Sequence, residues 1–335
     1  MDRIGCHGLD LLLLAPCQLK TALEELLAQQ VDALSRQCHE TLRYRVVSNA
    51  VAQEEVYAEI AAAQNLEQLP AMMVAPGIGH FFYGEFTRRF RRPECFAVAG
   101  QKPAAAFGSM GLPDPRGLYG MIGFNPLVFL VDRTRDPGLP VPQSWEELIN
   151  GRYARKVAFR GRDGRSYCEG ALLAVYTLAG EQGIQALSQT VQCRLHPAQM
   201  VKLAGSGRPE APAVSVIPLG FARMARPSAR VQIVWPREGA AVNPLMLLAK
   251  RDLSPGQRAL ADFLTGLQVA RLFWQAGFYP MAGSAQELQE RNYLWCGWAF
   301  LERQPVHALL DRLNGIMHAG AQQAVLAKGG CACGL

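Results

Sequence analysis

Two stretches decide the fold of this chain: LDLLLLAPC at residues 9–17 and AMMVAPGIGH at residues 71–80. Each is a short, continuous apolar run that ends near Pro or Gly, which is typical of a buried strand leading into a loop. Between them, the residue pattern predicts a helix over 17–33, a strand over 43–47 and a helix over 53–63. This alternation of strands and helices within about 75 residues predicts a parallel α/β sheet.

The same alternation continues after residue 120, where a long apolar run over 120–131 predicts a strand that crosses into a second domain. A run over 241–249 predicts a strand that returns to the first domain. Further strands are predicted at 156–159, 213–217 and 231–234. We therefore expect two α/β lobes, with residues 1–119 and 240–335 in lobe one and residues 120–239 in lobe two.

Composition excludes several classes of protein. Half of the 335 residues are hydrophobic and 19% are charged, which excludes a disordered chain and a coiled coil. No apolar run approaches the roughly 18 residues of a membrane-spanning helix. The net charge of +6 is mild, and no nucleic-acid motif accompanies it, so we expect no nucleic-acid partner. The one dense basic cluster favours a solvated helix end: Arg88, Arg89, Arg91 and Arg92.

The beginning of the chain resembles a lipoprotein signal, with LLLLAPC at residues 11–17. The apolar run is only about five residues, however, whereas a signal needs roughly 7–15, and Asp2 and Asp10 flank it. We expect a cytoplasmic protein, or a periplasmic one if a leader has been trimmed. In that setting, the nine cysteines favour free thiols, metal ligands or a reactive cysteine over structural disulfides.

Several segments resemble one known family, in the same order. PQSWEEL at 142–148, followed by RYARKVA at 152–158, is similar to a P-x-SWEDLLDPRYKGKVA segment in extracellular solute-binding proteins of iron- and polyamine-type ABC importers. Later landmarks of the family are matched by VSVIP at 214–218, VWPREG at 234–239, ADFL at 261–264 and FWQAGFYP at 273–280. The resemblance extends over residues 9–314.

The resemblance implies a two-lobed, periplasmic-binding-protein-like (class II) fold with a central ligand cleft. It also implies ligand capture by closure about two hinge crossovers, near residues 118–122 and 238–242, with an ABC permease as partner. We expect a monomer. Ferric-ion members of the family carry paired tyrosines after the strand that matches residues 214–217, but here PLGF stands at 218–221.

In an open α/β sheet, ligands bind beyond the carboxyl ends of the strands, where helix N-termini point. The loops at those positions supply the ligand-binding candidates: Cys17, Gln18, Ser48, Asn49, Gly77, Gly79, His80, Arg162, Arg165, Ser166 and Asn243. The Gly-rich loop at 161–166 enters a predicted helix with two arginines, a pattern that favours an anion site. An ordinary exposed turn is the alternative for this loop.

Metal ligands are predicted from the same loops. Cys17, His80 and Cys168 would present two thiolates and an imidazole to one cleft, a set that suits Zn, Ni, Cu or Fe. Two alternatives stay open: Cys168 as a small buried packing residue, and His80 as a hydrogen-bond partner of a backbone carbonyl. An anionic metal complex would use both this set and the two arginines.

The C-terminal residues 328–335 contain a Cys-Ala-Cys motif after two glycines. We expect a flexible tail in which Cys331 and Cys333 bind soft metal or exchange disulfides. A degenerate terminus with two accidental cysteines is the alternative.

Three functions are compatible with these features. The first is a solute-binding-protein-like binder of a metal ion, metal complex or small anion, acting as a cytoplasmic metal or metallocofactor carrier for a cofactor-accepting protein. The second is a substrate receptor of an ABC importer. The third is an enzyme with Cys17 as nucleophile and His80 as base. No local signature supports the enzyme, so we predict a binding protein.

Overall fold

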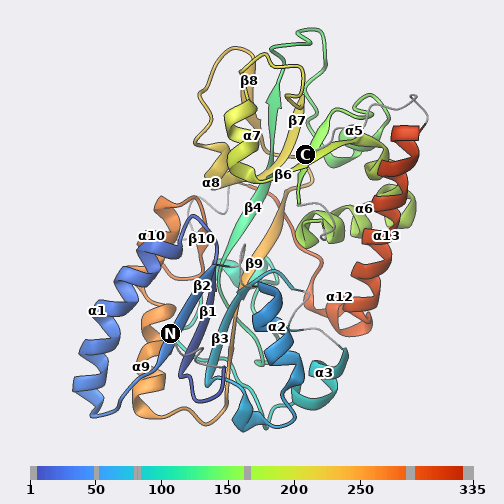
Figure 1. Ribbon diagram of the computed structural model, residues 1–335. Helices are drawn as coiled ribbons and strands as arrows, with labels where there is room; N and C mark the ends of the chain where they lie inside the picture. The colour runs from blue at the N-terminus through green and yellow to red at the C-terminus, as the bar shows by residue number, and fades with distance from the viewer. Residues whose placement is uncertain are drawn as a thin grey trace. The chain divides into compact units, whose positions relative to one another are not determined.

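The computed structural model (Figure 1) describes residues 6–48, 53–78, 81, 84–161, 167–283 and 291–326. The chain divides into two compact units. Unit 1 is made of three stretches: Met1–Phe124, Asn243–Glu290 and Gly297–His307. Unit 2 is made of the remaining three: Asn125–Val242, Arg291–Cys296 and the chain from Ala308 onward. Both units mix helices and strands, so the predicted α/β class is confirmed.

The sheet of unit 1 consists of β1 (Leu11–Ala15), β2 (Tyr44–Ser48), β3 (Met72–Pro76) and part of β9 (Ala240–Ala249). Their order is β2-β1-β3-β9. β1 runs parallel to both of its neighbours, and β9 is antiparallel to β3. All five residues of β1 are fully buried, which explains why this strand is a continuous apolar run and not an alternating one. The predicted parallel strands are confirmed.

Helices cover this sheet on both sides (Figure 1). The helices α1 (Lys20–Cys38), α9 (Pro255–Leu264) and α10 (Leu267–Gln275) pack against one another. The other helices of unit 1 are α2 (Gln53–Ala62), the 3-10 helix η1 (Leu66–Gln68), α3 (Gly84–Phe90), α4 (Ala106–Ser109) and α12 (Trp298–Arg303). The short strand β10 (Tyr279–Pro280) pairs with the beginning of β4.

The sheet of unit 2 is built from β4 (Gly120–Asp132), β5 (Val157–Arg160), β6 (Val191–Leu195), β7 (Val214–Pro218) and β8 (Val231–Val234). β4 begins in unit 1 and is antiparallel to β7 and β8. β5 lies between β7 and β6 and is parallel to both. The carboxyl ends of β5, β6 and β7 therefore lie at one edge of this sheet.

Unit 2 also contains α5 (Trp145–Ile149), α6 (Glu169–Thr190), α7 (Pro197–Leu203), α8 (Leu219–Ala222) and most of α13 (Val306–Leu326). A short strand, β11 (Tyr293–Leu294), pairs in parallel with the start of β9. Among the helices in the described part of the chain, none is long and apolar enough to span a membrane.

The structure differs from the expected lobes at α13, which was predicted to belong to lobe one with all of residues 240–335. The Asn314 Oδ1 accepts a hydrogen bond from the Tyr167 backbone N–H at 2.8 Å. Arg312 forms an ion pair with Glu181 of α6 at 2.9 Å. Gly320 approaches Ser188 so closely that a Cβ at this position would overlap its hydroxyl. These contacts hold α13 to unit 2.

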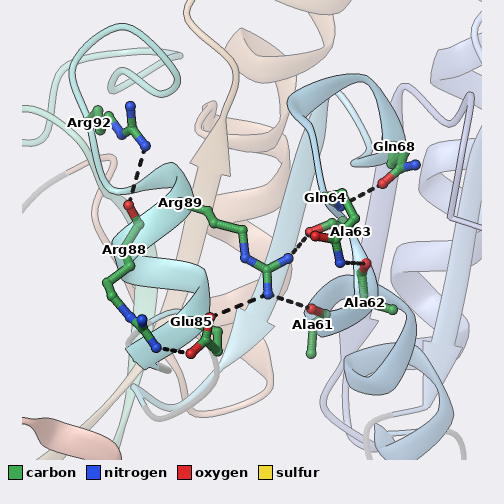
Figure 2. A network of polar contacts seen from close by, with 9 residues as sticks. All are labelled: Ala61, Ala62, Ala63, Gln64, Gln68, Glu85, Arg88, Arg89 and Arg92. Carbon is green, nitrogen blue, oxygen red and sulfur yellow. Dashed lines mark hydrogen bonds and ion pairs between the residues drawn. The ribbon is translucent and has the colours of Figure 1, made fainter.

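The arginine cluster that was predicted to be a solvated helix end is partly structural (Figure 2). Arg89 donates hydrogen bonds to the carbonyl of Ala63 and, at 3.5 Å, to that of Ala61, at the C-terminal end of α2. Arg91 lies near Glu302, with the charged atoms 3.6 Å apart, and its guanidinium lies over the ring of Tyr119. Burial and these partners make the prediction wrong for Arg89 and Arg91, whereas the Arg88 side chain is 73% exposed.

We expect the R89Q protein to lose about 1 kcal/mol of unfolding free energy, because carbonyls at the end of α2 lose a charged donor. Urea unfolding of the R89Q and wild-type proteins measures this loss. R88Q is the matched control, because it removes the same charge from the exposed neighbour. Equal losses in the two variants would contradict a specific role for Arg89.

The stability of unit 2 is expected to depend on His318. Burial, followed by the charge of Arg194, lowers the pKa of His318 below its ordinary value of 6.5. The unfolded chain therefore binds the proton more readily, so this contribution is fully present above pH 6.5 and is lost as the pH falls below it. Melting temperatures between about pH 8 and about pH 5 should fall less steeply for H318F than for the wild type. The H39N control, at an exposed histidine, should keep the wild-type slope; equal slopes in all three proteins would exclude this role.

Candidate functional site

The carboxyl ends of three parallel strands in unit 1 carry several of the predicted ligand-binding residues. Ala15 of β1 pairs with Ser48 of β2, and Cys17 lies in the turn that follows β1. The Cys17 Sγ is 3.9 Å from the Ser48 Oγ. At the end of β3, the Gly77 N–H donates to the carbonyl of Pro244 at 2.8 Å, which places Asn243 at the same edge.

The described residues predicted for this edge of unit 1 carry a thiol, a hydroxyl and two amide groups. Cys17 is exposed, and Gln18, Ser48 and Asn243 are partly buried. Gly77 has a φ of +90°, a conformation that favours glycine and allows the chain to turn sharply after β3. The edge therefore offers hydroxyl, amide and thiol groups as ligand contacts.

Cys17 precedes α1, although the sequence predicted a helix from residue 17. The Pro16 carbonyl accepts hydrogen bonds from the N–H groups of Leu19 at 2.9 Å and Lys20 at 3.0 Å. These bonds close a turn, so that the helix begins at Lys20. The correction leaves Cys17 on an exposed turn next to Ser48.

The carboxyl ends of β5 and β6 in unit 2 carry two arginines around a buried tyrosine. Arg160 ends β5, and Arg194 lies one residue before the end of β6. The Arg194 guanidinium carbon is 5.4 Å from the centroid of the Tyr167 ring, and the His318 ring centroid is 5.3 Å from it on α13. This arrangement fixes the residue that directly precedes Cys168.

Three residues at this edge were not predicted from the sequence: Arg194, Tyr167 and His318. Arg194 lies near the carboxyl end of β6, a strand that was not predicted from the sequence. Tyr167 follows the predicted anion loop directly. His318 had no local signal, since it lies far along the chain and reaches Tyr167 only through the packing of α13.

Cys168 is the N-cap residue of α6 and makes no side-chain capping hydrogen bond. Cys168 as a whole is partly exposed, but its thiol group is buried. Burial raises the pKa of the Cys168 thiol, which outweighs the opposite effects of the Arg160 charge and of the nearby Ala171 and Gly170 backbone groups. Because the thiol stays protonated at neutral pH, binding a metal here requires displacing that proton.

The predicted metal set stays a prediction. No three His, Cys, Asp or Glu side chains gather as a metal site within the described ranges. Cys17 belongs to unit 1 and Cys168 to unit 2. The remaining predicted ligand and metal residues lie outside the described part of the chain: Asn49, Gly79, His80, Arg162, Arg165, Ser166, Cys331 and Cys333.

Comparison with known proteins gives a family and a fold. The model of the family described as "Bacterial extracellular solute-binding protein" matches residues 67–304. No curated protein matches the chain.

Solved structures with a similar fold include a Trichodesmium protein, IdiA (FutA), in complex with iron and citrate ligands, at 12% identity and a TM-score of 0.61, covering 93% of this chain and 98% of that one. A Bordetella ferric binding protein has 13% identity and a TM-score of 0.60, with the same coverage of 93% and 98%. An ABC transporter structure from Clostridium perfringens has 13% identity and a TM-score of 0.62, covering 92% of this chain and 100% of that one.

At these identities the structures show the fold alone. Their agreement confirms the predicted fold class, which is the two-lobed, class II fold of periplasmic binding proteins. The family model covers more than half of the chain, from η1 to the end of α12. The chain belongs to the family of bacterial extracellular solute-binding proteins.

Proposed function

We propose that this solute-binding protein captures a small anion or an anionic metal complex, with ligand contacts at the carboxyl ends of its strands. The observation that carries the proposal is the presence of two arginines at one edge of unit 2: Arg160 ends β5, and Arg194 lies one residue before the end of the neighbouring parallel strand β6. Guanidinium groups bind carboxylate and phosphate oxygens with two parallel hydrogen bonds. The hydroxyl, amide and thiol groups around Cys17 in unit 1 suit hydroxyl and carbonyl atoms of a ligand.

An anionic complex fits this chain better than a bare ferric ion. The segment after β7 is Leu219–Ala222, which forms α8 and contains no tyrosine. Hard Fe(III) therefore lacks phenolate ligands at this point of the chain. A ligand that arrives with its own carboxylates needs only cationic and hydrogen-bonding partners, which Arg160 and Arg194 provide. The Trichodesmium protein described with iron and citrate gives a chemical precedent for such a complex.

The family favours an ABC permease as the partner that receives the ligand. A cytoplasmic carrier that serves a cofactor-accepting protein is the second candidate, and it rests on the cysteine-rich sequence. Both functions use the same binding step. Metal analysis of protein purified without oxygen, together with its ultraviolet–visible spectrum, identifies a metal that accompanies the ligand.

We expect R160Q and R194Q each to weaken the binding of ferric citrate and of citrate about tenfold, because a charged hydrogen-bonding partner of the anion is lost. Isothermal titration of each anion into the protein measures this change. R152Q is the matched control, since Arg152 is an exposed arginine of the same unit outside the strand ends. Unchanged affinity in R160Q and R194Q, or wild-type protein that binds only cationic or neutral solutes, would refute the anionic ligand.

The thiol of Cys17 is expected to contribute to soft-metal binding and not to the binding of citrate alone. C17S should lower the affinity for Zn²⁺ or Cu⁺ at least tenfold, because a hydroxyl is a poor substitute for a thiolate ligand. C38S is the control, at another free cysteine of unit 1. Metal competition with a chromophoric chelator measures both. If C17S and C38S match the wild type, Cys17 is no metal ligand.

A further inference from the structure

The positive charge of the protein is concentrated in unit 2. The stretches that form unit 2 contain 18 Lys and Arg and 10 Asp and Glu, whereas those of unit 1 contain 16 and 18. The overall charge of +6 thus conceals a slightly acidic unit and a strongly basic one. Such an asymmetry indicates a surface that interacts with polyanions.

Three segments of unit 2 meet where β4 ends and β8 begins. The Arg133 N–H donates to the carbonyl of Arg230 at 2.8 Å, and the Gly205 N–H donates to the Asp132 Oδ2 at 2.8 Å. The first segment follows β4, the second is the last turn of α7 with the residues after it, and the third connects α8 to β8 (Figure 1). Together they carry the following cationic residues, here named the basic surface: Arg133, Arg135, Lys202, Arg208, Arg223, Arg226 and Arg230.

The acidic residues of these segments neutralise little of this charge. Asp132 is 7% exposed and accepts backbone hydrogen bonds from Thr134 and Gly205. Glu210 pairs with Arg208, and Asp136 pairs with Lys156 of the neighbouring strand region. Three exposed arginines form no ion pair with any residue in the described ranges: Arg223, Arg226 and Arg230.

Apolar side chains stand exposed among these arginines. Met224 is 65% exposed and lies between Arg223 and Arg226 in the chain, and Ile233 of β8 is 41% exposed. Exposed apolar residues bordered by arginines are typical of surfaces that insert into the headgroup region of a bilayer. Single-stranded nucleic acid would call instead for aromatic stacking platforms, and the segment 222–233 has none.

We propose that the basic surface of unit 2 docks onto an anionic phospholipid membrane, with Met224 entering the headgroup region. The proposal is independent of the ligand. The segment 223–230 begins just after α8, which follows the carboxyl end of β7, and it reaches the start of β8 beside the end of β4, at the opposite edge of the sheet.

Flotation with lipid vesicles tests the proposal on the full chain. The probes are vesicles of phosphatidylcholine alone and of phosphatidylcholine mixed with phosphatidylglycerol. The wild type should float with the anionic vesicles only and be released by salt, because the attraction is electrostatic. Each arginine near an anionic surface contributes about fivefold to partitioning, so R223Q/R226Q/R230Q should bind at least tenfold more weakly. M224S should bind more weakly as well, but keep its salt dependence.

The matched control is R36Q/K102Q/R271Q, which removes three positive charges from exposed positions of unit 1. It should partition like the wild type, and both triple variants should keep the wild-type circular dichroism spectrum. Equal losses in the two triple variants would show that only net charge matters and would overturn the proposal. So would wild-type protein that ignores anionic vesicles at low salt but binds an acidic protein or nucleic acid.

Discussion

Parallel strands of one sheet all end at the same edge, and the candidate site of this protein depends on that constraint. In unit 1, the pairing of Ala15 with Ser48 fixes where β1 and β2 stop, so that the Cys17 thiol comes to the Ser48 hydroxyl. The pairing of Leu13 with Val74 does the same for β3. Any slip in this register would move both the buried leucines of β1 and the polar edge, which is why one apolar run specifies both.

In unit 2, the polar edge of the sheet also depends on contacts with a helix that is not adjacent in the sequence. The Tyr167 ring contacts Arg194 of β6 and His318 of α13, and its backbone N–H donates a hydrogen bond to Asn314. The start of α6 is therefore positioned by a helix that joins the unit late in the sequence. These contacts explain why α13 belongs to unit 2, although the sequence predicted it for lobe one.

The sequence predicted most of the strands, but it predicted neither β6 nor the contacts between distant segments. β8 was predicted with the bounds observed, and β2, β5, β7 and β9 were predicted to within two residues, because a buried strand is visible as a local apolar run. The pairing of Tyr167 with Asn314 joins positions 147 apart, and no local pattern reports it. The prediction for Arg89 failed for a different reason. A cluster of arginines predicts exposed side chains, yet Arg89 donates hydrogen bonds to backbone carbonyls at the C-terminal end of α2.

The sequence predicted the positions of the site residues more readily than their protonation states. Strand ends give the location of Cys17, Ser48, Gly77 and Cys168, but the charge state of a thiol depends on its enclosure. At Cys168 burial raises the pKa despite the nearby Arg160 and the start of α6, so this residue contributes a neutral thiol and not a thiolate. Permanent positive charge at this edge therefore comes from Arg160 and Arg194, because a guanidinium keeps its proton when partly buried. A ligand that brings negative charge with it matches such an edge, whereas a bare cation would face two like charges and a protonated thiol.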